Sequence, residues 1–355
     1  MDAAGVSSES AAIHQGAQAL GTRRSFLKSA AVLGAGELIA DTALGGQATA
    51  DANYEFEIPR GMTLLTFRDA GQYCLGVKTP KGILDVRKAA SRLKMPAPSS
   101  MDDLLRNGKG GMLKRLVDAA VAKAGSSNFL RPEQGLEYGP VVMNPEKIVM
   151  MGLNYRQHAI ETHSPIPSKP VLFNKYNNSL NCHNGVIHLP TEVARQFDYE
   201  VELVVVFGKK AHNVSEDDAL DYVAGYCTGN DFSARDLQTM TSQWMIGKTC
   251  DGFAPLGPYF VSADLVGDPN KLRLETRVNG EQRQDWNTDD MIFNCRQLIS
   301  FISKVMTIIP GDILFTGTPQ GVIMGKPKDQ QVWLKSGDQI ACSIEKLGEL
   351  KFTLA

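Results

Sequence analysis

The segment 197–207 constrains the fold of this chain more than any other, because it reads FDYEVELVVVF and joins a nearly continuous apolar run to two glutamates. Side chains of a strand alternate between the two faces of a sheet. Glu200 and Glu202 therefore share one face with Val204 and Val206, and the opposite face is apolar as well. This pattern predicts a strand that is buried on both sides.

Two carboxylates that face a buried interior need compensation, because each is costly to bury when charged and unpaired. Glu200 and Glu202 therefore require a cation or a cluster of basic side chains. A third acid, Asp231, follows at the junction of an expected strand and an expected helix, which Ser233 is placed to cap. Three carboxylates suit Mg²⁺, with Mn²⁺ or Ca²⁺ as alternatives, and match zinc poorly. The opposing interpretation is an exposed strand end with two surface glutamates and an Asp231 that only begins a helix.

Short apolar segments separated by turns dominate the chain after residue 144, which predicts an α+β fold that is rich in strands. The expected strands are 148–151, 171–173, 200–207, 272–278, 313–315 and 331–334. Asn279-Gly280 between two alternating segments predicts a hairpin with a type I′ turn. Helices are expected at 154–162, 215–222, 233–244 and 291–305.

The part of the chain before residue 145 has a different texture and is expected to form a small N-terminal α/β domain, residues 51–144, ahead of a catalytic domain, residues 145–355. Short strands alternate with turns between residues 62 and 86. Apolar residues at helical spacing between residues 99 and 124 are interrupted by Gly108, Gly110 and Gly111, which favours two short helices over one.

The first 50 residues predict a twin-arginine export signal. Arg23 and Arg24 precede a short, weakly apolar stretch, residues 29–40, and Ala48-Thr49-Ala50 provides small residues for cleavage. The alternative is an ordinary amphipathic N-terminal helix with a basic start. We expect a mature chain that starts near Asp51 and is exported to a bacterial periplasm or exterior.

Charge and cysteine content exclude some functions. Lys and Arg number 37 against 39 Asp and Glu, a formal net charge of −2, which argues against a nucleic-acid surface built on cationic excess. The mature chain contains no apolar run of the roughly 20 residues that a membrane-spanning helix needs. The six cysteines are scattered and form no C-x-x-C pair, so we interpret them as small buried residues, although export would permit a disulfide.

Five motifs in order resemble the fumarylacetoacetate hydrolase family, over about residues 145–355. They are GLNYRQHAIE at 152–161, the Glu-Val-Glu strand, NDFSARDLQ at 230–238, GK at 247–248 ahead of FAPLGP at 253–258, and TGTPQG at 316–321. The resemblance implies a mixed β-sandwich or roll and a homodimer. It also implies cleavage of carbon-carbon bonds in β-diketo acids such as acylpyruvates, or decarboxylation or tautomerisation of related 2-oxo acids, with a bound Mg²⁺ or similar ion.

The resemblance assigns roles to single residues of these motifs. It places the metal on the three carboxylates derived above. It implies that Lys248 stabilises an enolate or oxyanion near the metal. Thr318 and Gly317 would hold the substrate carboxylate, and Gln238 would offer a further polar contact to the substrate.

His158 and Glu161 lie three residues apart, so on a helix they share one face, and the carboxylate can orient the imidazole as a general base. Such pairs also occur on solvated helices without a catalytic task. The resemblance implies that this pair lies on a lid over the substrate and activates water, which favours hydrolysis over simple binding.

One departure from the family pattern concerns the wall of the pocket. Many members carry Lys-Pro after the Phe that matches Phe173, whereas Lys175 is kept here and the proline is absent. We expect a metal-dependent hydrolase of a β-diketo acid, an acylpyruvate or a fumarylacetoacetate-like compound. The alternatives are an isomerase, tautomerase or decarboxylase of 2-oxo acids on the same scaffold and, from another class, an exported protein that only binds 2-oxo acids.

Overall fold

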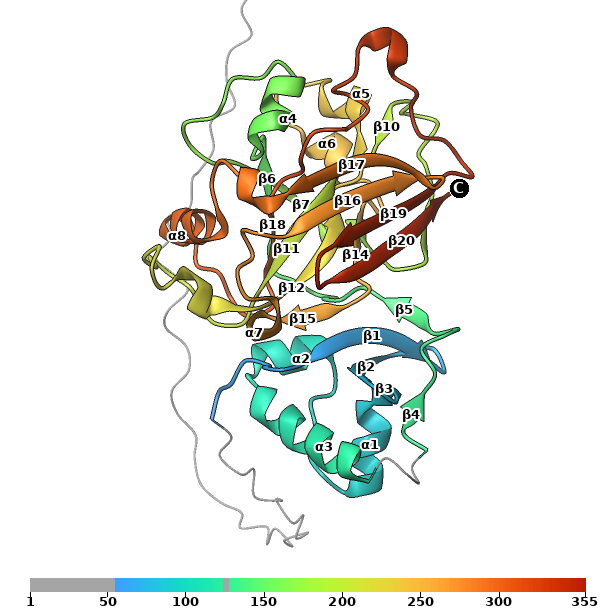
Figure 1. Ribbon diagram of the computed structural model, residues 1–355, viewed down its shortest axis with the longest axis vertical. Helices are drawn as coiled ribbons and strands as arrows, with labels where there is room; N and C mark the ends of the chain where they lie inside the picture. The colour runs from blue at the N-terminus through green and yellow to red at the C-terminus, as the bar shows by residue number, and fades with distance from the viewer. Residues whose placement is uncertain (1–54, 124–127) are drawn as a thin grey trace, which may run out of the picture. The chain divides into compact units, whose positions relative to one another are not determined.

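The computed structural model describes residues 55–123 and 128–355 (Figure 1). The predicted export signal, residues 1–50, lies outside the described residues and stays a prediction. Within the described residues the fold is mixed α+β and rich in strands, as the sequence predicts.

The largest sheet in the described residues has 13 strands, and β11 lies near its centre, between β12 and β18. All seven residues of β11 are buried, in agreement with its Val-rich sequence. The strands of this sheet are β1 Thr63–Asp69, β2 Gln72–Thr79, β3 Gly82–Asp85, β4 Leu130–Arg131, β5 Glu137–Gly139, β6 Ile148–Gly152, β7 Val171–Lys175, β8 Leu180–Cys182, β11 Val201–Phe207, β12 Val223–Asn230, β14 Ala254–Leu256, β15 Phe260–Ser262 and β18 Ile313–Phe315.

A second sheet of five strands packs against the first, in the order β17-β16-β19-β20-β9. Its strands are β9 Gly185–Ile187, β16 Arg273–Val278, β17 Glu281–Asn287, β19 Gln339–Ile344 and β20 Gly348–Leu354. Asn279 and Gly280 both have positive φ angles, 52° and 84°, and join β16 to β17. The predicted type I′ hairpin is therefore confirmed. The short strands β10 Phe197–Asp198 and β13 Ser233–Ala234 pair separately.

The two faces of β11 enter two different cores. Val201, Leu203 and Val205 belong to the core that also contains the buried residues of the second sheet. Val204 and Val206 belong to the core that they share with the helices of the N-terminal region. The prediction that this strand is buried on both sides is confirmed, and the exposed-strand alternative is wrong.

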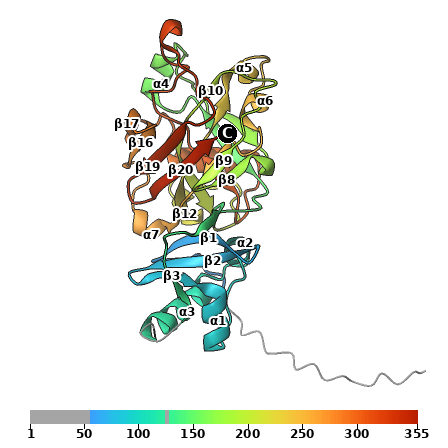
Figure 2. The ribbon, with the colours of Figure 1, turned by 90° about the vertical axis from the view of Figure 1, so that its right-hand side faces the viewer.

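The N-terminal region folds β1, β2 and β3 against three helices, α1 Val86–Leu93, α2 Met101–Arg106 and α3 Gly110–Ala122 (Figure 2). The predicted break between two helices is confirmed: Gly108 has φ +58°, and a Cβ there would lie 2.4 Å from the ring of Phe56. Strand β1 pairs with β15, so the main sheet is continuous across the expected boundary at residue 144. The division into two domains stays a prediction.

Two expected helices form where the sequence places them, α4 Arg156–Glu161 and α8 Cys295–Val305. Helix α8 begins with a capping box between Asn294 and Gln297. The remaining short helices of the described chain are α5 Arg235–Gln238, α6 Met245–Lys248, α7 Ala263–Val266, η1 Asn177–Ser179, η2 Ala219–Tyr222, η3 Thr288–Asp290 and η4 Lys328–Gln330.

Four local predictions need correction. The segment 215–222 forms only the 3-10 turn η2, and 233–244 contains β13 and the short α5 in place of a long helix. Ser233 does not cap a helix, because its hydroxyl donates to the carbonyl of Asp231 at 2.8 Å. The segment 331–334 forms no strand and contributes only an isolated bridge between Leu334 and Phe197. Contacts with distant parts of the chain replace the expected pattern in all three segments, through Arg296 at 216–217, β10 at 233–234 and Phe197 at Leu334.

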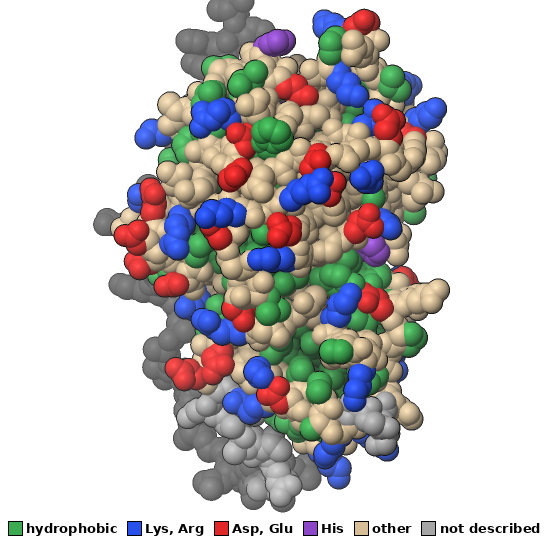
Figure 3. All heavy atoms as spheres, viewed as in Figure 1, with side chains coloured by type: hydrophobic (Ala, Val, Ile, Leu, Met, Phe, Trp, Pro, Cys, Tyr) green, Lys and Arg blue, Asp and Glu red, His purple; other side chains and the backbone are tan. Residues whose placement is uncertain are grey.

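The surface mixes both signs of charge, as Figure 3 shows on one face. None of the helices within residues 55–123 and 128–355 is long and apolar enough to cross a membrane. All six cysteines are free, and four of them are buried. The expectation that they act as small buried residues holds for those four.

Candidate active site

The three predicted metal ligands come together at one end of β11 and β12. These strands are antiparallel with Val201 opposite Asn230, so the start of β11 lies beside the end of β12. Glu200 precedes β11, Glu202 is its second residue, and Asp231 follows β12. All three side chains are buried, and one carboxylate oxygen from each lies within 4.8 Å of the others.

Buried cations surround two of the three carboxylates. Lys248 Nζ lies 2.8 Å from Glu200 Oε2 and 2.8 Å from Asp231 Oδ2. Lys175 Nζ lies 2.7 Å from the other oxygen of Asp231, and Arg235 Nη2 lies 2.7 Å from Glu200 Oε1. Within the described part of the chain no cation pairs with Glu202, whose Oε2 accepts the N–H of Gly317 at 2.7 Å.

This difference separates the pKa values of the two glutamates. Burial, followed by the charges of Asp231 and Glu200, raises the pKa of Glu202 well above its usual range. Burial acts on Glu200 in the same direction, but Arg235 and Lys248 outweigh it and hold the pKa of Glu200 below its usual range. The cluster therefore carries an uncompensated acidic position at Glu202. Three buried oxygen donors, one of which has no paired cation in the described part of the chain, fit a divalent cation held by Glu200, Glu202 and Asp231.

Lys248 reaches this cluster because helix α6 packs closely on α5. A Cβ on Gly247 would lie 2.3 Å from the backbone nitrogen of Gln238, so only glycine permits the approach. Burial lowers the pKa of Lys248, but Asp231 and Glu200 outweigh it and raise this pKa above the ordinary value. The amine is therefore a cation in the cluster, as a group that stabilises an enolate must be.

Lys175 supports Asp231 from outside the cavity. Its Nζ also donates to the carbonyls of Phe232 and Phe253, at 3.0 and 2.5 Å. Burial lowers the pKa of Lys175, and the nearby Asp231 opposes that change. The sequence showed only that this lysine is retained without the following proline, and the structure places it at a metal-ligand candidate.

Arg235 is a site residue that the sequence reasoning missed. Its Nε lies 2.9 Å from Asp198 Oδ2, and its Nη1 donates to Gln238 Oε1 at 2.9 Å. Asp198 also accepts the N–H groups of Ile323 and Met324. The available signal was an arginine inside the NDFSARD motif, but its partners are distant in sequence.

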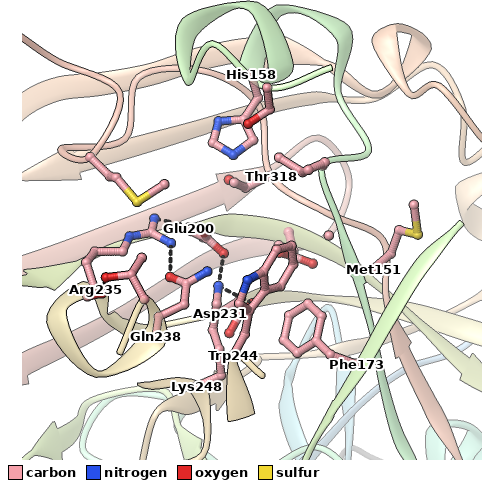
Figure 4. Close-up of a pocket in the computed structure, with 16 residues that line it drawn as sticks. Met151, His158, Phe173, Glu200, Asp231, Arg235, Gln238, Trp244, Lys248 and Thr318 are labelled. Atoms are coloured by element: carbon pink, nitrogen blue, oxygen red, sulfur yellow. Dashed lines mark hydrogen bonds and ion pairs between the residues drawn. The ribbon is translucent and has the colours of Figure 1, made fainter. Parts of the chain in front are cut away.

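A cavity of about 110 Å³ opens onto the cluster. One wall is polar and contains Glu200, Arg235, Gln238, Lys248 and Thr318 (Figure 4). Met151, Phe173 and Trp244 form an apolar side of the lining away from Arg235 (Figure 4). The volume is below the roughly 300–1,000 Å³ of pockets for drug-sized ligands, which indicates a small ligand.

His158 lies across the cavity from the carboxylate cluster, on α4 (Figure 4). Its side chain is buried, and its Nδ1 lies 3.5 Å from Glu161 Oε2. The Glu161 carboxylate accepts the N–H of Gly321 at 2.9 Å, which fixes its position. The expected alignment of this pair on one helix face is confirmed, and a solvated helix is not its setting.

The loop 316–321 passes between the cluster and His158. Gly317 has φ +95°, and a Cβ there would lie 2.8 Å from Cβ of Asn154, so the loop requires glycine. The Gly317 N–H donates to Glu202, and the Thr318 side chain lines the cavity. Gln284, which the sequence did not single out, donates to Thr318 Oγ1 at 2.9 Å.

Comparison with known proteins agrees with this arrangement. Residues 147–355 match the family model described as fumarylacetoacetate (FAA) hydrolase C-terminal. The chain is 44% identical over 256 residues to a 2,4-didehydro-3-deoxy-L-rhamnonate hydrolase from Sphingomonas sp. (strain SKA58), covering 71% of this chain and 89% of the relative. It is 36% identical over 307 residues to a mitochondrial oxaloacetate tautomerase from Homo sapiens, covering 83% and 92%.

Solved structures show the same fold. A fumarylacetoacetate hydrolase from Exiguobacterium antarcticum superposes with a TM-score of 0.68 at 29% identity, covering 82% of this chain and 99% of that structure. A 2-hydroxyhepta-2,4-diene-1,7-dioate isomerase from Mycobacterium marinum gives a TM-score of 0.62 at 28% identity, covering 83% and 98%. The motifs, the fold and the family match lead to one conclusion: the chain belongs to the fumarylacetoacetate hydrolase family.

Proposed function

We propose that the protein is a metal-dependent hydrolase that cleaves a carbon-carbon bond in a small β-diketo acid of the acylpyruvate type. One observation carries the proposal. His158, with Glu161 at its Nδ1, lies across a small cavity from a buried cluster of three carboxylates and Lys248. A base on one side of the substrate and a cationic, metal-binding wall on the other are what a hydrolysis through an enolate requires.

The residues of the polar wall would bind the acidic end of the substrate. Glu200, Glu202 and Asp231 would hold a divalent cation, for which Mg²⁺ is the first choice. When bound, this cation would polarise the 2-oxo and carboxylate oxygens and stabilise negative charge on the departing carbon fragment. Thr318 lines the cavity, and its hydroxyl would donate to the substrate carboxylate.

The proposed reaction consumes one water. His158 takes a proton from the water, and Glu161 stabilises the imidazolium that forms. The hydroxide adds to the distal carbonyl, and the bond between that carbon and its neighbour breaks. The electron pair of this bond passes to the pyruvate fragment as an enolate next to Lys248. The proton held by His158 then returns to the enolate carbon, so the products are a carboxylate, pyruvate and one released proton.

The two walls of the cavity favour a substrate with a single carboxylate and an apolar tail. Trp244, Phe173 and Met151 form the apolar wall. Burial of a short acyl chain against these side chains is favourable, because it removes apolar surface from water. Both cations of the described lining, Arg235 and Lys248, already pair with carboxylates of the protein. A second substrate carboxylate would have to compete for them, which disfavours dicarboxylates.

Tautomerisation of a 2-oxo acid is the second candidate, because the oxaloacetate tautomerase from Homo sapiens matches 83% of this chain. In that reaction His158 would take a proton from carbon and return it, and no water would be consumed. A protein that only binds 2-oxo acids is disfavoured, because binding alone does not require a general base, whereas the buried His158 and Glu161 form a pair that can act as one.

Incubation of Mg²⁺-loaded protein with acylpyruvates of increasing chain length, oxaloacetate and hydroxymuconate-type dienoates tests the proposal. We expect pyruvate and a carboxylic acid from a short acylpyruvate, with solvent ¹⁸O in the released acid. Conversion of oxaloacetate between its keto and enol forms, without cleavage of any acylpyruvate, would overturn the hydrolase proposal in favour of the tautomerase.

Export and assembly are further proposals. We expect that cleavage near Asp51 gives an exported chain and that this chain forms a homodimer. N-terminal sequencing of protein from the periplasm or medium, followed by light scattering, tests both. Recovery of only the chain that starts at Met1 would contradict export, and a monomeric mass would contradict the dimer.

A further inference from the structure

Gln284 occupies an unusual place in the second sheet. Strand β17 is exposed or half-exposed along its length except at Gln284, which is 1% exposed. A buried amide has two donor hydrogens and an acceptor oxygen to satisfy. In an edge strand of otherwise solvated residues, burying an amide is costly unless its partners are well defined.

All hydrogen-bonding positions of the Gln284 amide have partners. Oε1 accepts the N–H of Val201 at 3.1 Å and the hydroxyl of Thr276 at 2.9 Å. Nε2 donates to Thr318 Oγ1 and to the carbonyl of Pro319, both at 2.9 Å. Val201 lies between Glu200 and Glu202, so one side chain connects the strand of the metal-ligand candidates to the loop that lines the cavity.

The orientation of this amide is determined by backbone groups. The N–H of Val201 can only donate, and the carbonyl of Pro319 can only accept. Exchanging the amide oxygen and nitrogen of Gln284 would oppose donor to donor and acceptor to acceptor. Nε2 therefore faces Thr318 and acts as the donor in that contact.

The orientation of the Gln284 amide determines the direction in which the Thr318 hydroxyl donates. Since Oγ1 accepts from Gln284, its own hydrogen must be donated elsewhere, and no residue in the described part of the chain accepts it. The side chain lines the cavity between His158 and the carboxylate cluster (Figure 4). The loop reaches Gln284 because Gly321 has no Cβ, which would lie 2.3 Å from the carbonyl oxygen of Arg283.

We infer that Gln284 is a positioning residue that makes the Thr318 hydroxyl an obligate donor into the cavity, and so selects a ligand with a carboxylate oxygen at that point. The inference deepens the proposed function, on which it rests for the 2-oxo acid character of the ligand. Gln284 does not touch the ligand and acts through Thr318 alone.

Binding of oxalate, a planar mimic of a 2-oxo carboxylate, to Mg²⁺-loaded protein tests this inference without requiring turnover. Gln284→Glu keeps the side-chain shape and the oxygen that faces Val201 but places an acceptor toward Thr318 and the Pro319 carbonyl, so the Thr318 hydroxyl turns away from the cavity and the fold loses some stability. We expect oxalate to bind about 10- to 100-fold more weakly, the usual worth of one hydrogen bond to a charged group. Thr276→Val, which removes a partner on the oxygen side only, is the matched control and should change oxalate affinity less than about threefold.

A double-mutant cycle distinguishes positioning from a merely structural role. Thr318→Val removes the donor, so adding Gln284→Glu to it should weaken oxalate binding no further. Titration of Mg²⁺ alone and thermal unfolding should show that both variants are folded and bind metal as wild type does. Additive losses in the double variant, or unchanged oxalate affinity in folded Gln284→Glu, would overturn the inference. Absence of carbon-carbon cleavage in wild type would instead overturn the proposed function. The oxalate-binding comparison would still test the role of Gln284, because it does not depend on turnover.

Discussion

The N-terminal region and the site region use charge in opposite ways. In the N-terminal region ion pairs such as Arg68 with Glu137 and Lys114 with Asp118 are exposed. The core beneath them is built from leucines and other apolar side chains. In the site region four acidic and three basic side chains are buried together, namely Asp198, Glu200, Glu202, Asp231, Lys175, Arg235 and Lys248.

This difference indicates that the N-terminal region mainly stabilises the fold, whereas the buried charges of the site region serve binding and catalysis. Exposed ion pairs contribute little, so the N-terminal region derives its stability from apolar burial. Buried charges cost more to desolvate than they usually return, so a cluster of seven is weak support for stability. Their arrangement around a cavity is explained by binding and catalysis, and the four predictions below test that division.

The largest effect is expected at Glu202. Glu202→Ala should abolish Mg²⁺ binding and turnover, because it removes one of three oxygen donors. The free energy of unfolding without metal should stay unchanged or rise, because the change relieves repulsion with Glu200 and Asp231. Calorimetric titration with Mg²⁺ and urea unfolding measure the two quantities.

Glu349→Ala, at an exposed glutamate of β20, is the control and should leave both quantities near wild type. Equal Mg²⁺ affinity of Glu202→Ala and wild type would rule out Glu202 as a ligand. A large loss of stability in the metal-free variant would show that the buried charges of the site region stabilise the fold, which would contradict the difference drawn between the two regions.

The next largest effect is expected at His158. His158→Ala should lower turnover by about 10² to 10⁴, the usual contribution of a general base, and leave Mg²⁺ affinity unchanged. His163→Asn provides a matched control, because His163 is exposed just beyond α4 and its φ of 51° suits asparagine. Steady-state kinetics on the substrate found in the panel decide, and unchanged turnover in His158→Ala would remove it from the proposed role.

In the N-terminal region we expect stability to change without activity. Leu116 on α3 is fully buried, so Leu116→Ala should cost about 2–5 kcal/mol of unfolding free energy. Val121→Ala on the same helix is the control, because Val121 is exposed and its loss should cost less than about 0.5 kcal/mol. Turnover of folded Leu116→Ala should equal that of wild type, and a selective loss of turnover would show that the two regions are functionally coupled.

The smallest effect concerns the pH dependence of stability. Burial raises the pKa of Asp103, but Lys109, Ser99 and Asn107 outweigh it and lower this pKa to about 2 from an ordinary 3.8. A lowered folded pKa stabilises the fold above the unfolded pKa, and this stabilisation is lost as the pH falls from about 4 toward 2. Because Asp103 is partly exposed, we expect about 1 kcal/mol. Urea unfolding of wild type and Asp103→Asn across this range should show a shallower pH dependence in the variant, and parallel curves would contradict the assignment.

The sequence alone determined the features that depend on local pattern. The alternation in 197–207 predicted a strand buried on both faces, and Asn279-Gly280 predicted its hairpin, since both follow from side-chain direction and backbone conformation. The carboxylates of Glu200, Glu202 and Asp231 were grouped correctly, because a buried acid demands a partner wherever it lies. By contrast, 215–222 and 233–244 were predicted as helices from short periodic patterns that tertiary contacts override.

Only the tertiary structure decided how the site is supported. Lys175 reaches Asp231 from 56 positions earlier, and Gln284 reaches Val201 from 83 positions later, so no local spacing connects either pair. Arg235 stands in a recognised motif, yet its role depends on Asp198, which the pairing of β10 with β13 brings beside it. The sequence can show which residues have the chemistry of a site, because a buried charge requires compensation wherever it lies. The sequence cannot show which side chains provide that compensation, because the pairing of distant strands decides which side chains meet.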